Sequence, residues 1–128
     1  ALGRLHAAGF AHGRPAMRDL CWDGGEAHFI DLERFSVNRA SARRKALDVI
    51  VFAQSYIAEM GDVGPDLDQA MQAYRAAASS GSWDNVQRVA AWFALLSPAG
   101  AVVRRLKPGA AEFRALPKTL AYIGRALD

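Results

Sequence analysis

Apolar positions recur every three or four residues along most of the chain, which is the spacing of α-helices that bury one face. The longest such pattern covers residues 39–61, where Ser41 is suited to cap the start of a helix and Gly61 to end it. Pro98 is expected to end a later helix, and Pro117 to kink or split the last one. Four further helices are predicted, over residues 66–81, 83–97, 100–106 and 111–127.

The N-terminal part of the chain has a different pattern. Residues 1–10 predict a helix that stops at Gly9, and a loop follows it. Residues 20–31 contain two short runs with Cys, Trp, Phe and Ile on either side of Asp-Gly-Gly, which is a strong signal for a β-hairpin. The predicted fold is therefore mainly α with one small β-hairpin: a helix, a loop, the hairpin and then about five helices.

The composition limits the class of protein. At 128 residues and 52% hydrophobic residues the chain predicts one globular domain, and no segment is apolar for the ~18 residues of a membrane span. The single Cys21 excludes an internal disulfide and fits a reducing, cytoplasmic compartment, and we expect it to be buried as a small apolar residue. Because the chain starts without Met inside a predicted helix, we expect it to be a fragment.

The net charge of +3 comes from arginine, since 13 Arg stand against three Lys. A basic surface can meet phosphate or the anionic inner face of a membrane, although solvated helix faces are the simpler interpretation. Nucleic acid is a weaker alternative because aromatic residues do not alternate with these clusters. The clustered arginines are Arg43, Arg44, Arg104 and Arg105.

The candidate chemistry lies around the hairpin. Asp19 stands just before its first strand and Asp31 at the end of its second, so the hairpin should bring the two carboxylates together. Paired carboxylates repel each other unless a cation or an arginine lies between them. Oxygen ligands of this kind suit Mg²⁺. His12 and Gly13 precede this pair on a structured loop.

Three segments occur in the order "LHAAGFAHGRPAMRD", "FIDLERF" and "KALDVIVFAQSY". Together they resemble the C-terminal lobe of the protein-kinase-like fold. The resemblance is strongest to atypical kinases whose loop begins His-Gly-Asp, such as RIO-like and KEOPS-associated kinases and the bacterial lipopolysaccharide kinases of the Kdo/WaaP and InaA type. It implies a catalytic-loop and metal region over residues 1–38 and a helical subdomain over 39–128. It also implies that Asp48 ties back to the catalytic-loop backbone.

The chain departs from the kinase pattern at two positions that matter. Arg14 stands where the catalytic Asp is expected, and Asp19 stands where the pattern has Asn. Arginine cannot accept a proton, so the general base is missing. One hypothesis is that Asp19 and Asp31 hold Mg²⁺ while Arg14 steadies the transferred phosphate. The other is that Arg14, Asp19 and Asp31 form a metal-free ion-pair cluster, as in a pseudokinase.

The resemblance implies Mg²⁺ and ATP as cofactors and His12, Arg14, Asp19 and Asp31 as the site. The chain has no Gly-rich loop, and its three lysines all follow Asp31, so the N-terminal lobe that grips ATP is absent from it. We therefore predict no turnover by this chain alone. The predicted function is the C-lobe of an atypical kinase acting on a sugar, lipopolysaccharide or other small acceptor. The alternative is a pseudokinase-type binding or scaffolding module.

Overall fold

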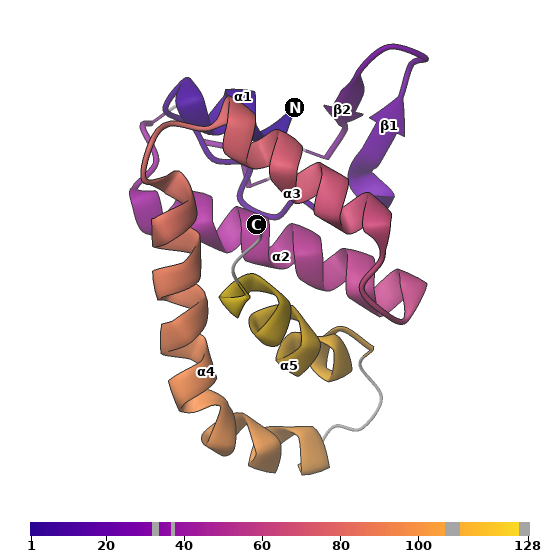
Figure 1. The fold of residues 1–128 in the computed structure, drawn as a ribbon, viewed down its shortest axis with the longest axis vertical. Coiled ribbons are helices and arrows are strands. Elements are labelled where there is room, and N and C mark those ends of the chain that lie inside the picture. Colours follow the sequence, from indigo (N-terminus) through magenta and orange to yellow (C-terminus); the bar gives the residue numbers. More distant parts are fainter. Residues whose placement is uncertain (32–33, 37, 107–110, 126–128) are drawn as a thin grey trace.

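A computed structural model describes residues 1–31, 34–36, 38–106 and 111–125, with the side chains of residues 97–113 left outside the description. Within these residues the protein is mainly helical with one small antiparallel sheet, which confirms the predicted fold class (Figure 1). None of the helices in this part of the chain is both long and apolar enough to cross a membrane.

The N-terminal part holds helix α1, a short 3-10 helix η1 and the two-stranded hairpin. The predicted hairpin is confirmed: the strands are antiparallel, and Cys21 lies opposite His28. Cys21 is exposed, so the prediction that it is buried was wrong; an isolated two-stranded ribbon leaves one face uncovered. The elements are α1 (Leu2–Ala7), η1 (Met17–Asp19), β1 (Leu20–Trp22) and β2 (Ala27–Phe29).

The hairpin turn is stabilised by the carboxylate of Asp23. It accepts hydrogen bonds from the backbone N–H of Glu26 at 2.8 Å and of Gly25 at 3.0 Å, and it contacts the His28 ring at 2.9 Å. These bonds favour the charged form, the one to Glu26 most, and they lower the pKa of Asp23 to about 2. Gly24 supplies the positive φ of +94° that the tight turn requires.

Helix α2 (Ala42–Met60) is the centre of the helical part, and its predicted ends are confirmed. The Ser41 hydroxyl accepts a hydrogen bond from the Arg44 N–H at the start, and Gly61 adopts a left-handed φ of +85° at the end. Helix α3 (Pro65–Ala77) packs against α1, while α4 (Ser82–Leu106) and α5 (Ala111–Gly124) pack against α2 and each other (Figure 1). The largest fully buried apolar residues are Val49, Ile57, Leu67, Val86 and Ile123.

One prediction based on proline was wrong. Helix α4 continues through Pro98, where we expected one helix to end and another to start. Helix α5 continues through Pro117, so the split expected there as one of two outcomes does not occur, and the kink stays a prediction. A proline inside a helix removes one hydrogen bond and favours a bend, which packing on both sides of it can offset. Figure 1 shows α4 curving around α5. Four helices therefore follow the hairpin in the described residues, and α1 ends at Ala7, before the predicted stop.

Candidate functional site

The hairpin brings the two predicted acids to one cavity. The backbone N–H of Ile30 donates to the carbonyl of Asp19 at 2.9 Å, which extends the strand pairing one step beyond Leu20 and Phe29. Asp19 and Asp31 consequently line the same cavity of about 70 Å³. We call it the carboxylate cavity; the described residues that line it are His12, Arg14, Arg18, Asp19, Asp31 and Arg34. All four residues that the resemblance names as the site thus lie together.

A buried carboxylate on α2 holds the loop that carries His12. One oxygen of Asp48 accepts from the His12 N–H at 2.6 Å, and the other accepts from the Gly13 N–H at 2.9 Å. Asp48 is only 2% exposed, so these bonds lie in a low-dielectric surrounding where they are strong. The contact that the resemblance implies for Asp48, with the backbone of this loop, is therefore present.

The position of Gly13 leaves no space for a side chain. Its φ is +99°, and a Cβ placed on it would lie 2.6 Å from the Arg34 carbonyl oxygen and 2.7 Å from the Arg34 Cβ. The segment after β2 therefore packs directly on the His12 loop. This close approach places the Arg34 side chain beside Arg14 at the wall of the cavity.

Two residues that sequence reasoning did not assign to the site support Asp48 from behind. The His6 ring on α1 contacts Asp48 through Nε2 at 3.2 Å and the Tyr74 hydroxyl on α3 through Nδ1 at 3.0 Å. The tautomer with its proton on Nε2 satisfies both contacts. Burial first, and then the charge of Asp48, raise the pKa of Tyr74 to about 12, so its hydroxyl keeps the proton it can donate.

Among the described residues that line the cavity, positive side chains outnumber negative ones. Arg18 lies 3.6 Å from the buried carboxylate of Asp19. Asp31 also has an interaction partner of its own. In the described part of the chain, however, no hydrogen bond or ion pair engages the guanidinium of Arg14 or Arg34. The cavity therefore offers free cationic groups beside two acids.

His12 carries a buried polar atom that lacks a partner. Its ring is 2% exposed and packs edge-on against Phe29, with 4.9 Å between the ring centroids. Nδ1 accepts a long hydrogen bond of 3.4 Å from the Arg14 N–H, which leaves the proton on Nε2. Within the described residues Nε2 has no hydrogen-bond partner. An unsatisfied buried donor costs about 1–3 kcal/mol, so a water or a ligand oxygen is expected to complete it.

The donor set fits Mg²⁺ only when phosphate oxygens share it. Among the described residues no group of three His, Cys, Asp or Glu side chains could hold a metal. Mg²⁺ commonly takes one or two carboxylates and fills its other positions with water and substrate phosphates. Asp19 and Asp31 provide two such carboxylates on one cavity, so they suit a metal that arrives with a phosphate chain.

A second and larger cavity adjoins the first. It has a volume of about 210 Å³ and shares the side chains of Arg14 and Arg34 with the carboxylate cavity. Its floor comes from α2, through Val51, Gln54 and Ser55. A molecule in this second cavity would lie next to the two acids, with the two arginines between.

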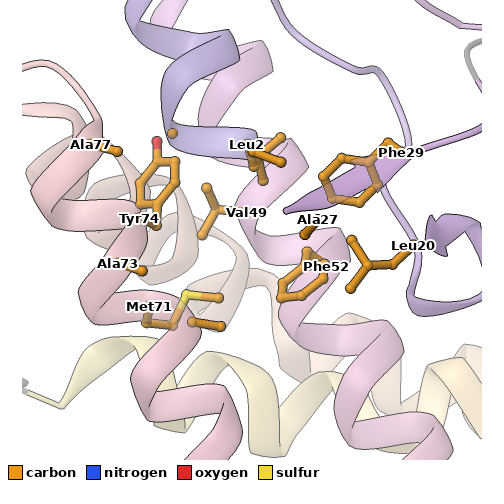
Figure 2. Close-up of a pocket in the computed structure, with 13 residues that line it drawn as sticks. Leu2, Leu20, Ala27, Phe29, Val49, Phe52, Met71, Ala73, Tyr74 and Ala77 are labelled. Carbon is orange, nitrogen blue, oxygen red and sulfur yellow. The ribbon is translucent and has the colours of Figure 1, made fainter. Parts of the chain in front are cut away.

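A third cavity is apolar and lies on the other side of the hairpin. Figure 2 shows Leu20 and Phe29 of the hairpin and Phe52 of α2 on one side of it, with Met71 and Tyr74 of α3 on the other. Its volume is about 210 Å³. The Tyr74 hydroxyl is already bonded to His6. This cavity therefore offers apolar contact rather than reactive groups.

The first predicted basic cluster, Arg43 and Arg44, is not among the described residues that line the cavities with the two acids and the two shared arginines. Arg43 and Arg44 are exposed in the first turn of α2, and the Arg43 guanidinium lies 5.4 Å from the centre of the Trp92 ring. A cation–π contact of this kind stabilises the packing of α2 against α4 without any ligand. The side chains of Arg104 and Arg105 lie outside the described residues.

Comparison with known proteins gives one relative of modest similarity. The chain is 31% identical over 86 residues to a protein of Haemophilus influenzae (strain ATCC 51907 / DSM 11121 / KW20 / Rd) described as "Uncharacterized protein". The matched region is 67% of this chain and 36% of the relative, so the chain spans about a third of that protein's length. No family model and no solved structure matches the chain.

Proposed function

We propose that this chain is the C-terminal lobe of an atypical, kinase-like phosphotransferase. The observation that carries the proposal is the clamp of Asp48 on the backbone of His12 and Gly13. It holds the His12 loop against the cavity that Asp19 and Asp31 share, as the resemblance to the kinase-like fold leads one to expect. Each part of this arrangement comes from a different segment of the chain.

The residues divide the chemistry among them. Asp19 and Asp31 would hold Mg²⁺ together with the phosphate oxygens of ATP, and the metal would neutralise charge on the transferred group. Arg14 lies on the same cavity and would steady that group, since it cannot act as a base. General-base help is worth ~10²–10⁴-fold, whereas phosphoryl transfer depends mainly on positioning and charge neutralisation. Loss of the base therefore slows the reaction without abolishing it.

The acceptor and the cellular location follow from the same resemblance. Only a short segment separates Asp31 from Ser41, which leaves no room for a long peptide-docking loop. We therefore propose a sugar, lipopolysaccharide or other small acceptor. We place the protein in the cytoplasm, where ATP is available, and assign the grip on ATP to an N-terminal lobe outside this chain.

One observation favours a second candidate, a binding module without phosphotransfer. Among the described residues, three arginines and two acids line the carboxylate cavity, so their summed formal charge is positive before any metal binds. Such a cavity can bind a phosphate group through Arg14 and Arg34 alone. In this version Asp19 and Asp31 orient the arginines and hold no metal.

Titration of the full-length protein with ATP, with and without Mg²⁺, separates the two candidates. For the phosphotransferase, Asp31→Asn should weaken Mg²⁺-ATP binding at least tenfold, which corresponds to about 1.4 kcal/mol. The matched control is Asp84→Asn, which removes an exposed acid on α4 and should change nothing. Binding that is equally tight without Mg²⁺ and in Asp31→Asn would refute the metal site and support the binding module.

A further inference from the structure

The larger cavity beside the two acids has the position of an acceptor site. It shares Arg14 and Arg34 with the carboxylate cavity, so a group bound there would contact the same two arginines that border the proposed transfer site. The remaining lining comes from the His12 loop and from one face of α2. The described residues that line it are Gly13, Arg14, Ala16, Arg34, Val51, Gln54 and Ser55.

The described residues that line this cavity carry charge of one sign, because none of them is acidic. The Ser55 hydroxyl is already engaged, since it donates to the Phe52 carbonyl at 2.8 Å and accepts from the Met17 N–H at 3.0 Å. Gln54 also has a partner. The guanidinium groups of Arg14 and Arg34 are thus the polar groups that remain for a ligand within the described part of the chain.

The size of the cavity limits what it can hold. Its volume of about 210 Å³ is below the roughly 300–1,000 Å³ of sites that enclose a whole drug-sized ligand. It therefore suits one end of a molecule. Paired guanidinium groups present planar sets of N–H donors that match the oxygens of phosphate and carboxylate.

We propose that this cavity binds an oxyanion group of the acceptor, so that the substrate is a small molecule bearing a phosphate or a carboxylate. That the bound molecule is the acceptor of a phosphoryl group rests on the proposed function, while the oxyanion site itself does not. It also gives a reason for arginine at position 14: a carboxylate at the wall shared by both cavities would repel an anionic acceptor.

The test uses inorganic phosphate and acetate as probes, titrated into the full-length protein without Mg²⁺ and followed by calorimetry. Phosphate binding should weaken at least fivefold in Arg34→Gln and be lost in Gln54→Glu, which places a carboxylate inside the cavity. The controls make the same changes at exposed positions of other helices, Arg88→Gln on α4 and Gln69→Glu on α3, and should bind phosphate like the parent. Far-UV circular dichroism checks that each variant folds.

The outcomes separate this inference from the kinase proposal. Tighter binding of acetate than of phosphate, with the same response to the variants, supports the site and identifies the group as a carboxylate. Phosphate binding that is absent, or that Arg34→Gln and Gln54→Glu leave unchanged, overturns the inference even if Mg²⁺-ATP binding depends on Asp31. Phosphate binding that responds to these variants, in a protein whose ATP binding ignores Asp31, supports the oxyanion site and refutes the kinase.

Discussion

Replacing Asp48 with alanine removes the group that holds the His12 loop on α2. Three N–H groups then lose their acceptor: the backbone N–H of His12 and of Gly13, and the Nε2 of His6. Asp48 is 2% exposed and His6 is 1% exposed, so water cannot replace the lost oxygens without opening the packing between α1 and α2.

The expected loss can be worked out from these contacts. A hydrogen bond to a charged group contributes about 1.5–3 kcal/mol, and three such bonds would sum to more than 4 kcal/mol. Local relaxation recovers part of this, so we expect Asp48→Ala to lower the free energy of unfolding by about 3–5 kcal/mol. That loss is a large fraction of the roughly 5–15 kcal/mol by which a domain of this size is stable.

Asp48→Asn is a finer test because it keeps the shape of the side chain. The amide retains one acceptor oxygen, but its NH₂ group then faces an N–H donor of the His12 loop. We expect a loss of about 2–3 kcal/mol, smaller than for alanine. The matched controls Asp66→Asn and Asp84→Asn remove exposed acids from the first turns of α3 and α4, and should each cost less than about 1 kcal/mol.

Urea unfolding followed by far-UV circular dichroism measures these differences, and amide hydrogen exchange locates them. The amides of His12 and Gly13 should exchange slowly in the parent and fast in Asp48→Asn, while the amides inside α4 keep their protection. A loss below about 1 kcal/mol in Asp48→Ala, with both loop amides still protected, would refute the role of Asp48 as a clamp.

Three further predictions concern the loop, the network behind it and the hairpin. Gly13→Ala should cost at least 2 kcal/mol more in urea unfolding than Gly24→Ala, because both glycines have a positive φ but only a Cβ at Gly13 would collide with Arg34; equal costs would contradict the close packing. The pKa of Tyr74 is raised to about 12 from 10, so the protonated phenol contributes fully to the free energy of unfolding below pH 10, and this contribution is lost as pH rises toward 12. Absorbance titration at 295 nm should show this phenol ionising at a higher pH than a free tyrosine. The pKa of Asp23 is lowered to about 2 from 3.8, so its support of the turn is complete above pH 4 and is lost as pH falls toward 2, which the NMR shifts of the turn amides should report.

Local signals in the sequence predicted the elements whose ends are set by local chemistry. Ser41 and Gly61 bound α2 as expected, because capping by a hydroxyl and a left-handed glycine involve only neighbouring backbone groups. The Asp-Gly-Gly turn predicted the hairpin, and the hairpin placed Asp19 and Asp31 on one cavity. The geometry of a tight antiparallel pair brings the residues at its two ends together, so the rest of the fold is not needed to predict that these two acids are close.

Features that depend on distant packing could not be predicted in the same way. Helix α4 continues through Pro98, whereas the sequence around the proline contains only a stop signal. His6 and Tyr74 are 68 residues apart, and neither residue type is unusual on a buried helix face. The number of arginines around the acids could not be predicted from the sequence either, since Arg34 is brought to the cavity by the packing of its backbone on Gly13.

The charge of the carboxylate cavity bears on the two hypotheses for Asp31, in which either a Mg²⁺ ion or an arginine neutralises its carboxylate. The described residues that line it, three arginines and two acids, sum to a positive formal charge, so a bare Mg²⁺ ion would add to charge already in excess and should bind weakly. A metal that arrives with a nucleoside triphosphate brings net negative charge, which the arginines can balance. The metal and arginine versions therefore share one requirement, a phosphate group in the cavity. They differ in whether the binding of that phosphate depends on Mg²⁺ and on Asp31, so weaker Mg²⁺-ATP binding in Asp31→Asn supports the metal version and unchanged binding supports the arginine version.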